Sequence, residues 1–471
     1  MDSRISARTL AGALGGWRTR TPTYEALADG IRLLCLDNRV AAHTALPAER
    51  ELAHALGISR TTVAAAYRSL RHSGHIESLQ GSGSVTLPQA RRGTDRVFAD
   101  GRGLDLQQAS PAAWPGLAGV IAEVAADAAS LVGRPGYDIL GSTALRTAIA
   151  DRYTARGIPT DPEQILVTNG GQHAIHLVTA ALLQRGDTAL LETPTYPHAA
   201  DAVRATGARL TGLPVTVSDG WDLDRAEQAF ARARPAVAYL MPWFQNPTGR
   251  VMTVREEATI RAAASRAGTV LVLDETTAEL AIDGAVDTGA DFGPTAVRIG
   301  SLGKTVWGGL RVGWVRADPV LIRRLVGQRP RRDLGTPELE QAIAVRLLRM
   351  MPDILPQRAA LLREGRDALR QRLAARLPEW RVPAAAGGVS LWVGLDAPLS
   401  GALVMAARSA GVHLSAGPRF ALDGGHDGYL RLPFTAPPAQ LRDAVDVLAD
   451  LWPRVREGAP AVATDAVAAI V

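Results

Sequence analysis

The pattern of hydrophobic and polar residues changes character about a hundred residues into the chain. Before that point, apolar residues recur at helical spacing in YEALADGIRLLCL, from Tyr24 to about Leu36, and in two shorter segments that follow. Beyond it, short unbroken apolar runs such as ILVT and TVLVLD alternate with helical stretches. The change predicts two folded units of different class.

The first unit is predicted to contain three helices and a β-hairpin. PAERELAHAL predicts a short helix that ends at Gly57, and Ser59 is a suitable N-cap for the next helix, SRTTVAAAYRSLRHSG. HIESLQGSGSVTLP then predicts two short strands around a glycine-rich turn. Helices that precede a hairpin at this length indicate a small α+β domain over residues 22–88.

The second unit is predicted to be an α/β domain over residues 105–455. Buried strands that alternate with helices predict a mostly parallel sheet covered on both faces. We expect this large lobe at about 130–345 and a smaller α+β lobe at about 346–455, where helices at 355–376 and 400–411 accompany the short strands VSLWVGL and YLRLPF. The polar, arginine- and glycine-rich residues 89–104 are predicted to be a linker.

Composition narrows the class of protein. The chain has 471 residues, of which 47% are hydrophobic and 21% charged, as expected of a folded soluble protein. Neither a hydrophobic leader in MDSRISARTL nor an apolar run long enough for a membrane span is found, so we expect a cytoplasmic protein without membrane contact. Cys35 is the only cysteine, which excludes an intrachain disulfide, and no metal site is predicted.

The positive charge is concentrated at the front of the chain. Residues 1–90 carry ten arginines against seven acidic residues, and residues 91–103 carry four against two, which accounts for the whole net charge of +5. A basic front end on a neutral body predicts a polyanionic partner for the first domain.

The helix that begins at Ser59 has the composition of a DNA-recognition helix. Arg60, Thr61 and Thr62 lie at its N-terminal end, where such helices present side chains to base edges and phosphates. Arg50 in the preceding helix is placed for a phosphate contact. Taken alone, SRTT also describes a capped surface helix.

The longer run LPAERELAHALGISRTTVAAAYRSLRHSGHIESLQGSGSV resembles the winged helix-turn-helix domain of GntR-type bacterial regulators. The resemblance extends over residues 22–87 and implies binding to a double-stranded DNA operator. The residues that it implies in DNA contact are Arg50, Ser59, Arg60, Thr61 and Thr62, with Gly81, Ser82 and Gly83 in the wing.

A second unusual feature is the lysine content. Of the 52 lysine and arginine residues, only Lys304 is a lysine. A GC-rich genome explains why lysine is scarce, but not why position 304 keeps one. An uncharged lysine amine forms an imine with an aldehyde, which a guanidinium does not, so an aldehyde cofactor gives a chemical reason for the exception.

Pyridoxal 5′-phosphate (PLP) is such an aldehyde, and the sequence offers each support that it needs. Ser301 and Arg311 suit its phosphate, together with the two glycines of TNGGQHAIH at a predicted helix start. Asp274, at the end of an apolar strand, suits the pyridine nitrogen, Asn246 in FQNPTG the ring hydroxyl, and Tyr196 in TPTYP the ring face. Singly, each has an ordinary explanation as a helix cap, a turn or a core ring.

Residues from about 105 to 450 resemble fold-type I PLP-dependent aminotransferases. The resemblance lies in GYDILGSTALRTAIADRY, VTNGGQHA, ETPTYPHAA, QNPTGR, LVLDE, SLGKTVWGGLRVGW and YLRLPF. It implies that Lys304 forms the imine with PLP, that Asp274 pairs with the pyridine nitrogen, that Asn246 holds the ring hydroxyl and that Tyr196 stacks on the ring. It also implies the following phosphate ligands: Gly171, Gln172, Ser301 and Arg311.

Two further residues follow from the same resemblance, and one expected residue is missing. Tyr137 matches a tyrosine that reaches the phosphate of the neighbouring subunit, which implies a head-to-tail homodimer. Arg431 matches an arginine that binds a substrate carboxylate. The family usually has a tyrosine shortly after the pyridine aspartate, whereas this chain has Thr276 and Thr277 in DETTAEL. The loss of that phenol is expected to weaken transamination more than cofactor binding.

The two domains together resemble the MocR branch of GntR-type regulators. By that resemblance, the chain is a transcriptional regulator that senses PLP, or an amino compound that displaces Lys304 from PLP by aldimine exchange, and the linker passes the change to the DNA-binding domain. Two alternatives stay open: a working aminotransferase with an accessory DNA-binding domain, and a regulator that no longer binds PLP. Complete turnover with a keto acid distinguishes the first alternative.

Overall fold

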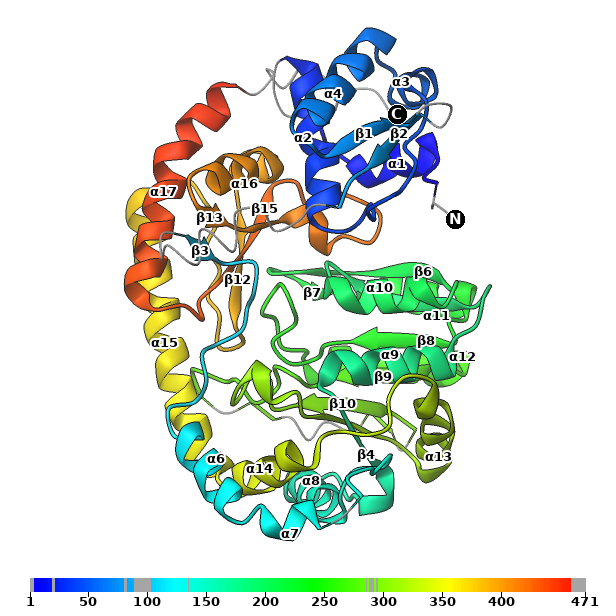
Figure 1. Cartoon of the computed structure of the whole chain (residues 1–471), viewed down its shortest axis with the longest axis vertical. Coiled ribbons are helices and arrows are strands. Elements are labelled where there is room, and N and C mark those ends of the chain that lie inside the picture. The colour runs from blue at the N-terminus through cyan, green and yellow to red at the C-terminus, as the bar shows by residue number, and fades with distance from the viewer. Residues whose placement is uncertain are drawn as a thin grey trace.

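The chain folds into a small front domain and a larger two-lobed rear domain, as the computed structural model in Figure 1 shows. The structure describes residues 4–18, 22–79, 83–88, 103–133, 135–284, 286–287, 292–293 and 295–458. Gly81 and Ser82, which were predicted in the wing, lie outside these ranges.

Apart from α1, the front domain has the predicted order of helices and strands. Its elements are α1 (Ala7–Leu14), α2 (Thr23–Leu36), α3 (Glu49–Leu56), α4 (Arg60–His72), β1 (Ile76–Leu79) and β2 (Gly83–Thr86). Gly57 ends α3 in the left-handed conformation at φ 61°, and the Ser59 hydroxyl caps α4 by accepting the Thr62 N–H. β1 and β2 pair antiparallel, which confirms the predicted hairpin.

The helix α1 was not predicted from the sequence. Leu10 and Leu14 of this helix and the nearby Trp17 are buried in the same hydrophobic core as α2, α3 and α4. The helix is only eight residues long, with its hydrophobic stripe limited to these few positions, so the periodic pattern is too short to identify it.

A mostly parallel sheet forms the centre of the large lobe. Within the described residues the sheet has eight strands, in the order β4-β11-β10-β9-β8-β5-β6-β7, and only β11 and β7 run antiparallel to their neighbours. In that order the strands span Ile165–Thr168, Gly313–Arg316, Val297–Ser301, Val270–Asp274, Val237–Leu240, Thr188–Thr193, Arg209–Thr216 and Gly220–Trp221. This arrangement agrees with the predicted fold class.

Helices cover both faces of this sheet. On one face α9, α10 and α13 pack on alternate strand residues such as Leu191 and Val237, while α11 and α12 pack on Leu190 and Ala238 from the other. Burial on both faces explains why these strands are almost continuously apolar. The helices of the lobe are α6 (Leu117–Ala126), α7 (Ala129–Val132), α8 (Thr143–Ala155), α9 (Gly171–Leu182), α10 (Pro197–Ala205), α11 (Leu223–Ala233), α12 (Val254–Ala267), α13 (Pro319–Gln328) and α14 (Glu338–Arg349), with the short 3-10 helices η1 (Pro162–Gln164), η2 (Gly308–Leu310) and η3 (Arg329–Arg331).

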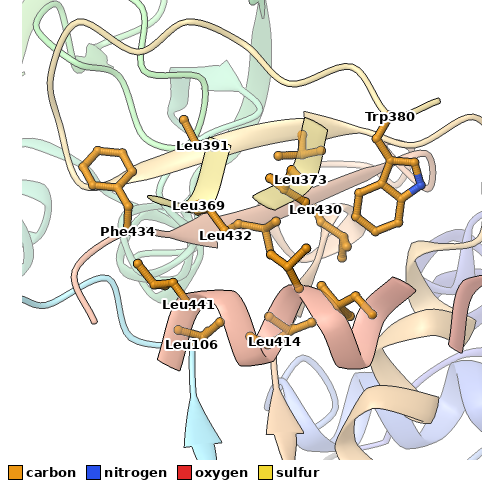
Figure 2. Close-up of a cluster of buried hydrophobic side chains, with 14 of the residues drawn as sticks. Leu106, Leu369, Leu373, Trp380, Leu391, Leu414, Leu430, Leu432, Phe434 and Leu441 are labelled. Carbon is orange, nitrogen blue, oxygen red and sulfur yellow. The ribbon is translucent and has the colours of Figure 1, made fainter. Parts of the chain in front are cut away.

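The small lobe packs helices on a short antiparallel sheet. Its elements are α15 (Met351–Arg376), β12 (Ser390–Gly394), α16 (Ser400–Ser409), β13 (Val412–His413), β14 (Ser415–Ala416), η4 (Gly417–Phe420), β15 (Tyr429–Pro433) and α17 (Pro438–Glu457). Figure 2 shows the leucine-rich core between the sheet and the helices, including Leu432 and Leu441. β3 (Leu104–Asp105) pairs with β13, so the residues after the predicted linker join this lobe.

The front domain lies directly against the small lobe, as Figure 1 shows near α16. Leu33 of α2 packs on the small-lobe core, and a Cβ on Gly401 of α16 would approach the Leu33 side chain to 3.2 Å. Arg39 donates to the Pro418 carbonyl at 3.4 Å. These contacts connect the two domains independently of residues 89–102.

Among the residues that the structure describes, no helix combines the length and the apolar composition that a membrane crossing requires.

Candidate functional site

A cavity of about 530 Å³ lies between the large and small lobes. Apart from Tyr137, every rear-domain residue predicted for the site lines it: Gly171, Gln172, Tyr196, Asn246, Asp274, Ser301, Lys304, Arg311 and Arg431. The fold therefore brings together residues that are spread over much of the rear domain.

The carboxyl edge of the parallel strands supplies much of the cavity's polar wall. Asp274 is the last residue of β9 and Ser301 the last of β10. Asn246 lies in the loop after β8, and Tyr196 lies between β5 and α10. Open α/β sheets bind ligands at this edge, because the loops that follow the strands open outward there.

Lys304 extends into this cavity from the turn after β10. Its Nζ donates to the carbonyl of Ala109 at 2.6 Å. Burial, together with the charge of Arg431, lowers the pKa of Lys304 from 10.5 to about 8, although the carboxylate of Asp274 opposes both effects. The amine is therefore far closer to its uncharged, nucleophilic form at neutral pH than an exposed lysine is.

The lowered pKa predicts an unusual pH profile for Lys304. In cofactor-free protein, acylation by a small amine-directed reagent is expected to rise with pH to a midpoint near 8 and to level off above it, whereas an unshifted lysine reaches its midpoint only near 10.5. The labelled peptide, quantified by mass spectrometry, identifies the site. Arg431→Met is expected to move the midpoint upward, because it removes a positive charge.

The same protein in denaturant serves as the reference, with a midpoint near 10.5. Between the two values the folded chain holds fewer protons at this group than the unfolded chain, so the contribution of Lys304 to stability rises with pH through that window. A native profile that matches the denatured one would contradict the assigned environment of Lys304.

Asp274 is held rigidly at the opposite side of the cavity. It is 1% exposed, accepts the Thr276 N–H at 2.9 Å and accepts the Tyr239 hydroxyl at 2.5 Å. Burial raises the pKa of this carboxyl, although both hydrogen bonds favour the ionised form. Among the described residues, no cationic side chain hydrogen-bonds to this buried carboxylate, which is therefore well suited to a cationic ring nitrogen.

The two threonines after Asp274 do not replace a phenol. Thr277 donates to the Trp243 carbonyl at 3.0 Å, and Thr276 uses its backbone N–H on Asp274. The nearest phenol in this network is that of Tyr239, which comes from β8 and bonds to the carboxylate itself.

The turn between β4 and α9 forms one end of the cavity, and its geometry suits an anion. Gly171 begins α9, and Gly170 before it has φ 86°, where a Cβ would approach the Arg311 Nη2 to 2.8 Å. Arg311 is anchored by donation to the Asn169 carbonyl at 2.7 Å. The Ser301 hydroxyl accepts a backbone N–H of the following turn at 3.0 Å. A helix N-terminus, a hydroxyl and a guanidinium therefore converge there.

Arg431 enters the cavity from β15 of the small lobe. It is 6% exposed, its guanidinium lies over the Phe420 ring at 5.2 Å, and it donates to the Gln107 carbonyl. Burial, with the charge of Arg419, lowers its pKa to about 10. Its Nε is buried and has no hydrogen-bond partner among the described residues.

Tyr137 is the one predicted residue outside this cavity. It lies on the loop before α8 with 75% of its surface exposed. Within one chain it does not reach the other predicted ligands.

The chemistry of this cavity fits PLP. Within the described ranges, Gln172 Oε1 and Asn246 Oδ1 are also buried without a partner, so polar atoms are available for a ligand. The glycine turn leaves room where a Cβ would collide with Arg311. A nucleophilic amine, a buried carboxylate and an anion site are thus present in one cavity.

Most of the predicted DNA-contact residues that the structure describes are exposed near the start of α4, on α3 and at the start of β2. Ser59, Arg60 and Thr61 are exposed at the start of α4, and Arg50 is exposed on α3. Arg50 and Arg60 line a surface hollow together with Gly83 at the start of β2. The helices α3 and α4 and the hairpin strand β2 therefore contribute to one basic concavity.

Two of these residues also have local structural roles. The Ser59 hydroxyl caps α4 and contacts the Thr62 hydroxyl at 2.8 Å, and Arg60 lies 3.4 Å from Glu49. The Arg60 side chain is 72% exposed, so this ion pair is weak and leaves the guanidinium accessible.

Sequence reasoning missed several residues of the cavity. Ala109 contributes only a carbonyl, Tyr239 acts through Asp274, and Arg419 is one arginine among many. A backbone carbonyl has no sequence signature, and the two side chains are identified only by their position in the fold. Tyr239 had one usable signal, since a tyrosine inside a buried strand needs a partner for its hydroxyl.

Comparison with known families agrees with this division of the chain. Residues 120–448 match the family model described as aminotransferase class I and II. Residues 23–85 match the model described as bacterial regulatory proteins, gntR family.

Individual bacterial regulators resemble much of the chain. The probable rhizopine catabolism regulatory protein MocR of Rhizobium meliloti is 30% identical over 332 residues, which cover 64% of this chain and 66% of that protein. The uncharacterized HTH-type transcriptional regulator YdfD of Bacillus subtilis is 25% identical over 451 residues, covering 88% and 92%.

A solved structure resembles the rear domain. The α-aminoadipate aminotransferase LysN of Thermus thermophilus, crystallised with N-(5′-phosphopyridoxyl)-L-leucine, superposes with a TM-score of 0.69 and 30% identity. The match covers 79% of this chain and 95% of that one.

Proposed function

This chain belongs to the aminotransferase class I and II family and joins that domain to a GntR-family domain, as MocR-type regulators do, and from this we propose that it is a PLP-dependent regulator of transcription. The observation that carries the proposal is the coexistence, in one chain, of a cavity lined by Lys304 and an accessible basic hollow lined by Arg50 and Arg60. We assign DNA binding to residues 22–88, connection to 89–104 and ligand sensing to 105–455.

The residues of the cavity divide the cofactor between them in this proposal. The N-terminus of α9, Ser301 and Arg311 would hold the phosphate, Asp274 would pair with the pyridine nitrogen, and Tyr196 would lie against the ring. Gln172 and Asn246 direct amide groups to the phosphate end and the ring hydroxyl. When bound, PLP supplies an aldehyde that condenses reversibly with primary amines.

Lys304 is the amine of the resting protein in this proposal. Its pKa of about 8 allows it to give up a proton near neutral pH and take it back when an incoming amine replaces it. Arg431 binds the carboxylate of that incoming amino compound, because it lines the cavity and its buried Nε has no hydrogen-bond partner among the described residues. The effector thereby contacts both lobes and biases their relative position.

The proposal includes a head-to-tail homodimer. Tyr137 is exposed and remote from the cavity of its own chain, which is the position required of a side chain that completes a neighbour's phosphate site.

A working aminotransferase is the second candidate, and the likeness to LysN favours it. The two candidates share the cavity and differ in turnover. Steady conversion of an amino acid and a keto acid by the purified protein would favour the enzyme, whereas a spectral response to amines without turnover, together with a change in DNA affinity, supports the regulator.

Two substitutions in the front domain are expected to affect base preference and overall DNA affinity separately. Arg60→Ala is expected to relax base preference, with a loss of about 1–3 kcal/mol on the operator, because a guanidinium at the start of α4 can pair bidentately with guanine. Arg50→Ala is expected to weaken all DNA similarly and to reduce the salt dependence by about one unit of slope, because it contacts a phosphate. Fluorescence anisotropy on selected and scrambled duplexes at several salt concentrations measures both.

The exposed Arg323, on α13 of the rear domain, provides the control, and its replacement by alanine is expected to leave DNA affinity unchanged. If neither Arg60→Ala nor Arg50→Ala alters binding, the DNA surface has been assigned to the wrong face.

A further inference from the structure

Arg419 in η4 belongs to two cavities at once. It lines the cavity that contains Lys304 and Arg431, and it lines a second, smaller cavity between the front domain and the small lobe. Its side chain is 12% exposed and is therefore largely buried at the boundary between these two cavities. No other described residue lines both.

On the ligand side, Arg419 adds a second positive charge near Arg431. Its charge contributes to the lowered pKa of Arg431, which indicates that the two guanidiniums act on each other through the interior. The Nε of Arg431 has no partner within the described ranges. A single ligand carboxylate on Arg431 would leave Arg419 with only its ion pair to the partly exposed Asp201.

The one ion pair recorded for Arg419 is easily exchanged. It joins Nη2 to the Asp201 carboxylate at 3.2 Å, and the Asp201 side chain is 46% exposed. Arg204 also pairs with Asp201, at 3.3 Å. Because such partly exposed pairs contribute little, a ligand carboxylate can take the place of Asp201 on the enclosed guanidinium.

On the other side, η4 contacts the front domain. The Pro418 carbonyl, immediately before Arg419, accepts the Arg39 guanidinium at 3.4 Å. Asp37, at the end of α2, lines the same small cavity as Arg419. Burial raises the pKa of Asp37, while the charges of Arg419, Arg39 and Arg408 lower it, so Arg419 helps to stabilise this carboxylate at the contact between domains.

We propose that Arg419 binds a second carboxylate on the effector and that this binding weakens the docking of the DNA-binding domain on the small lobe. The inference rests on the proposed function and assigns its effector to amino acids with an acidic side chain, with Arg431 on the α-carboxylate. When Arg419 pairs with the ligand carboxylate, it stabilises the ionised Asp37 less. The free-energy cost of burying the Asp37 carboxylate then rises where α2 meets the small lobe.

Matched pairs of amino acids test the ligand class in the full-length, PLP-loaded protein. L-Aspartate, L-glutamate and L-2-aminoadipate are each compared with the corresponding side-chain amide, which has nearly the same shape and no charge. The concentration that gives half the absorbance change of the cofactor is expected to be tenfold or more lower for at least one acid than for its amide. In Arg419→Gln this preference is expected to disappear while PLP uptake is retained.

Arg204→Gln is the matched control. It removes the other arginine that pairs with Asp201, but Arg204 does not line the ligand cavity, so the acid preference is expected to persist. Equal responses to acids and amides, or a preference that survives in Arg419→Gln, would overturn the inference. Absence of a response to any amine would instead overturn the proposed function, so the two failures are distinguishable.

Amide hydrogen exchange gives the second readout, which is independent of cofactor chemistry. Saturation with the preferred acid is expected to speed exchange in α2 and in residues 415–428 of the wild type, and to have no such effect in Arg419→Gln. Unchanged exchange in the wild type would overturn the link between ligand binding and domain docking.

Discussion

Lys304→Ala is expected to abolish covalent attachment of PLP. Borohydride treatment of the PLP-loaded wild type is expected to leave a pyridoxyl label on the peptide that contains residue 304, and no label on the variant. The chain has no other lysine, so no second side-chain amine can substitute for it. Digestion followed by mass spectrometry measures the label, and its loss in the variant is expected to be complete rather than partial.

Lys304→Arg is the matched variant, because it keeps a cation in the same cavity but cannot form an imine under these conditions. It is expected to resemble Lys304→Ala in the labelling experiment. A wild type without label on this peptide, after exposure to PLP, would remove the basis of the sensing proposal.

Arg329→Ala is expected to destabilise the rear domain by about 3–5 kcal/mol, because it leaves several buried acceptors without a donor. Arg329 is fully buried and donates at 2.6 Å to each of Asp333, the Ile139 carbonyl and the Val167 carbonyl. The bonds tie β4 to the loop that follows Tyr137. The midpoint of thermal unfolding is expected to fall by several degrees, with weaker PLP binding.

Arg331 lies in the same short helix and is exposed, so Arg331→Ala provides the control and is expected to change stability by less than about 0.5 kcal/mol. Arg329→Lys is expected to recover only part of the loss, since an ammonium cannot reproduce the fork of donors. Equal midpoints for Arg329→Ala and Arg331→Ala would show that these hydrogen bonds contribute little.

The local structure of the front domain was predictable because its signals are local. Gly57 and Ser59 end one helix and begin the next by backbone conformation and side-chain capping, and both effects operate within a few residues. The helix from Met351 shows the limit of that approach. It begins four residues before the predicted start at 355, because Pro356 lies inside the helix without ending it.

The rear-domain cavity was predictable to the extent that its residues lie at strand ends. A carboxylate after an apolar strand and a glycine turn before a helix have recognisable positions in an α/β fold, and Asp274 and Gly171 line one cavity as expected. Tyr239 and Arg419 were not identified, because their importance depends on packing across the fold. No local pattern distinguishes Arg419 from 50 other arginines.

The direct contact between the two domains could not be predicted from the sequence either. The linker was expected to carry the signal, whereas the structure adds a direct contact of α2 with α16 and of Arg39, three residues after α2, with η4. Such a contact joins residues that are more than 350 positions apart, as Arg39 and Pro418 are, and periodicity carries no information about it.

The packing of Leu33 against Gly401 has a consequence for engineering and for evolution. A DNA-binding domain transferred from another regulator would need a compatible α2 surface as well as a suitable operator preference. Recombination between related genes should therefore preserve α2 and α16 as a matched pair, and chimaeras that separate them should bind DNA but ignore the ligand.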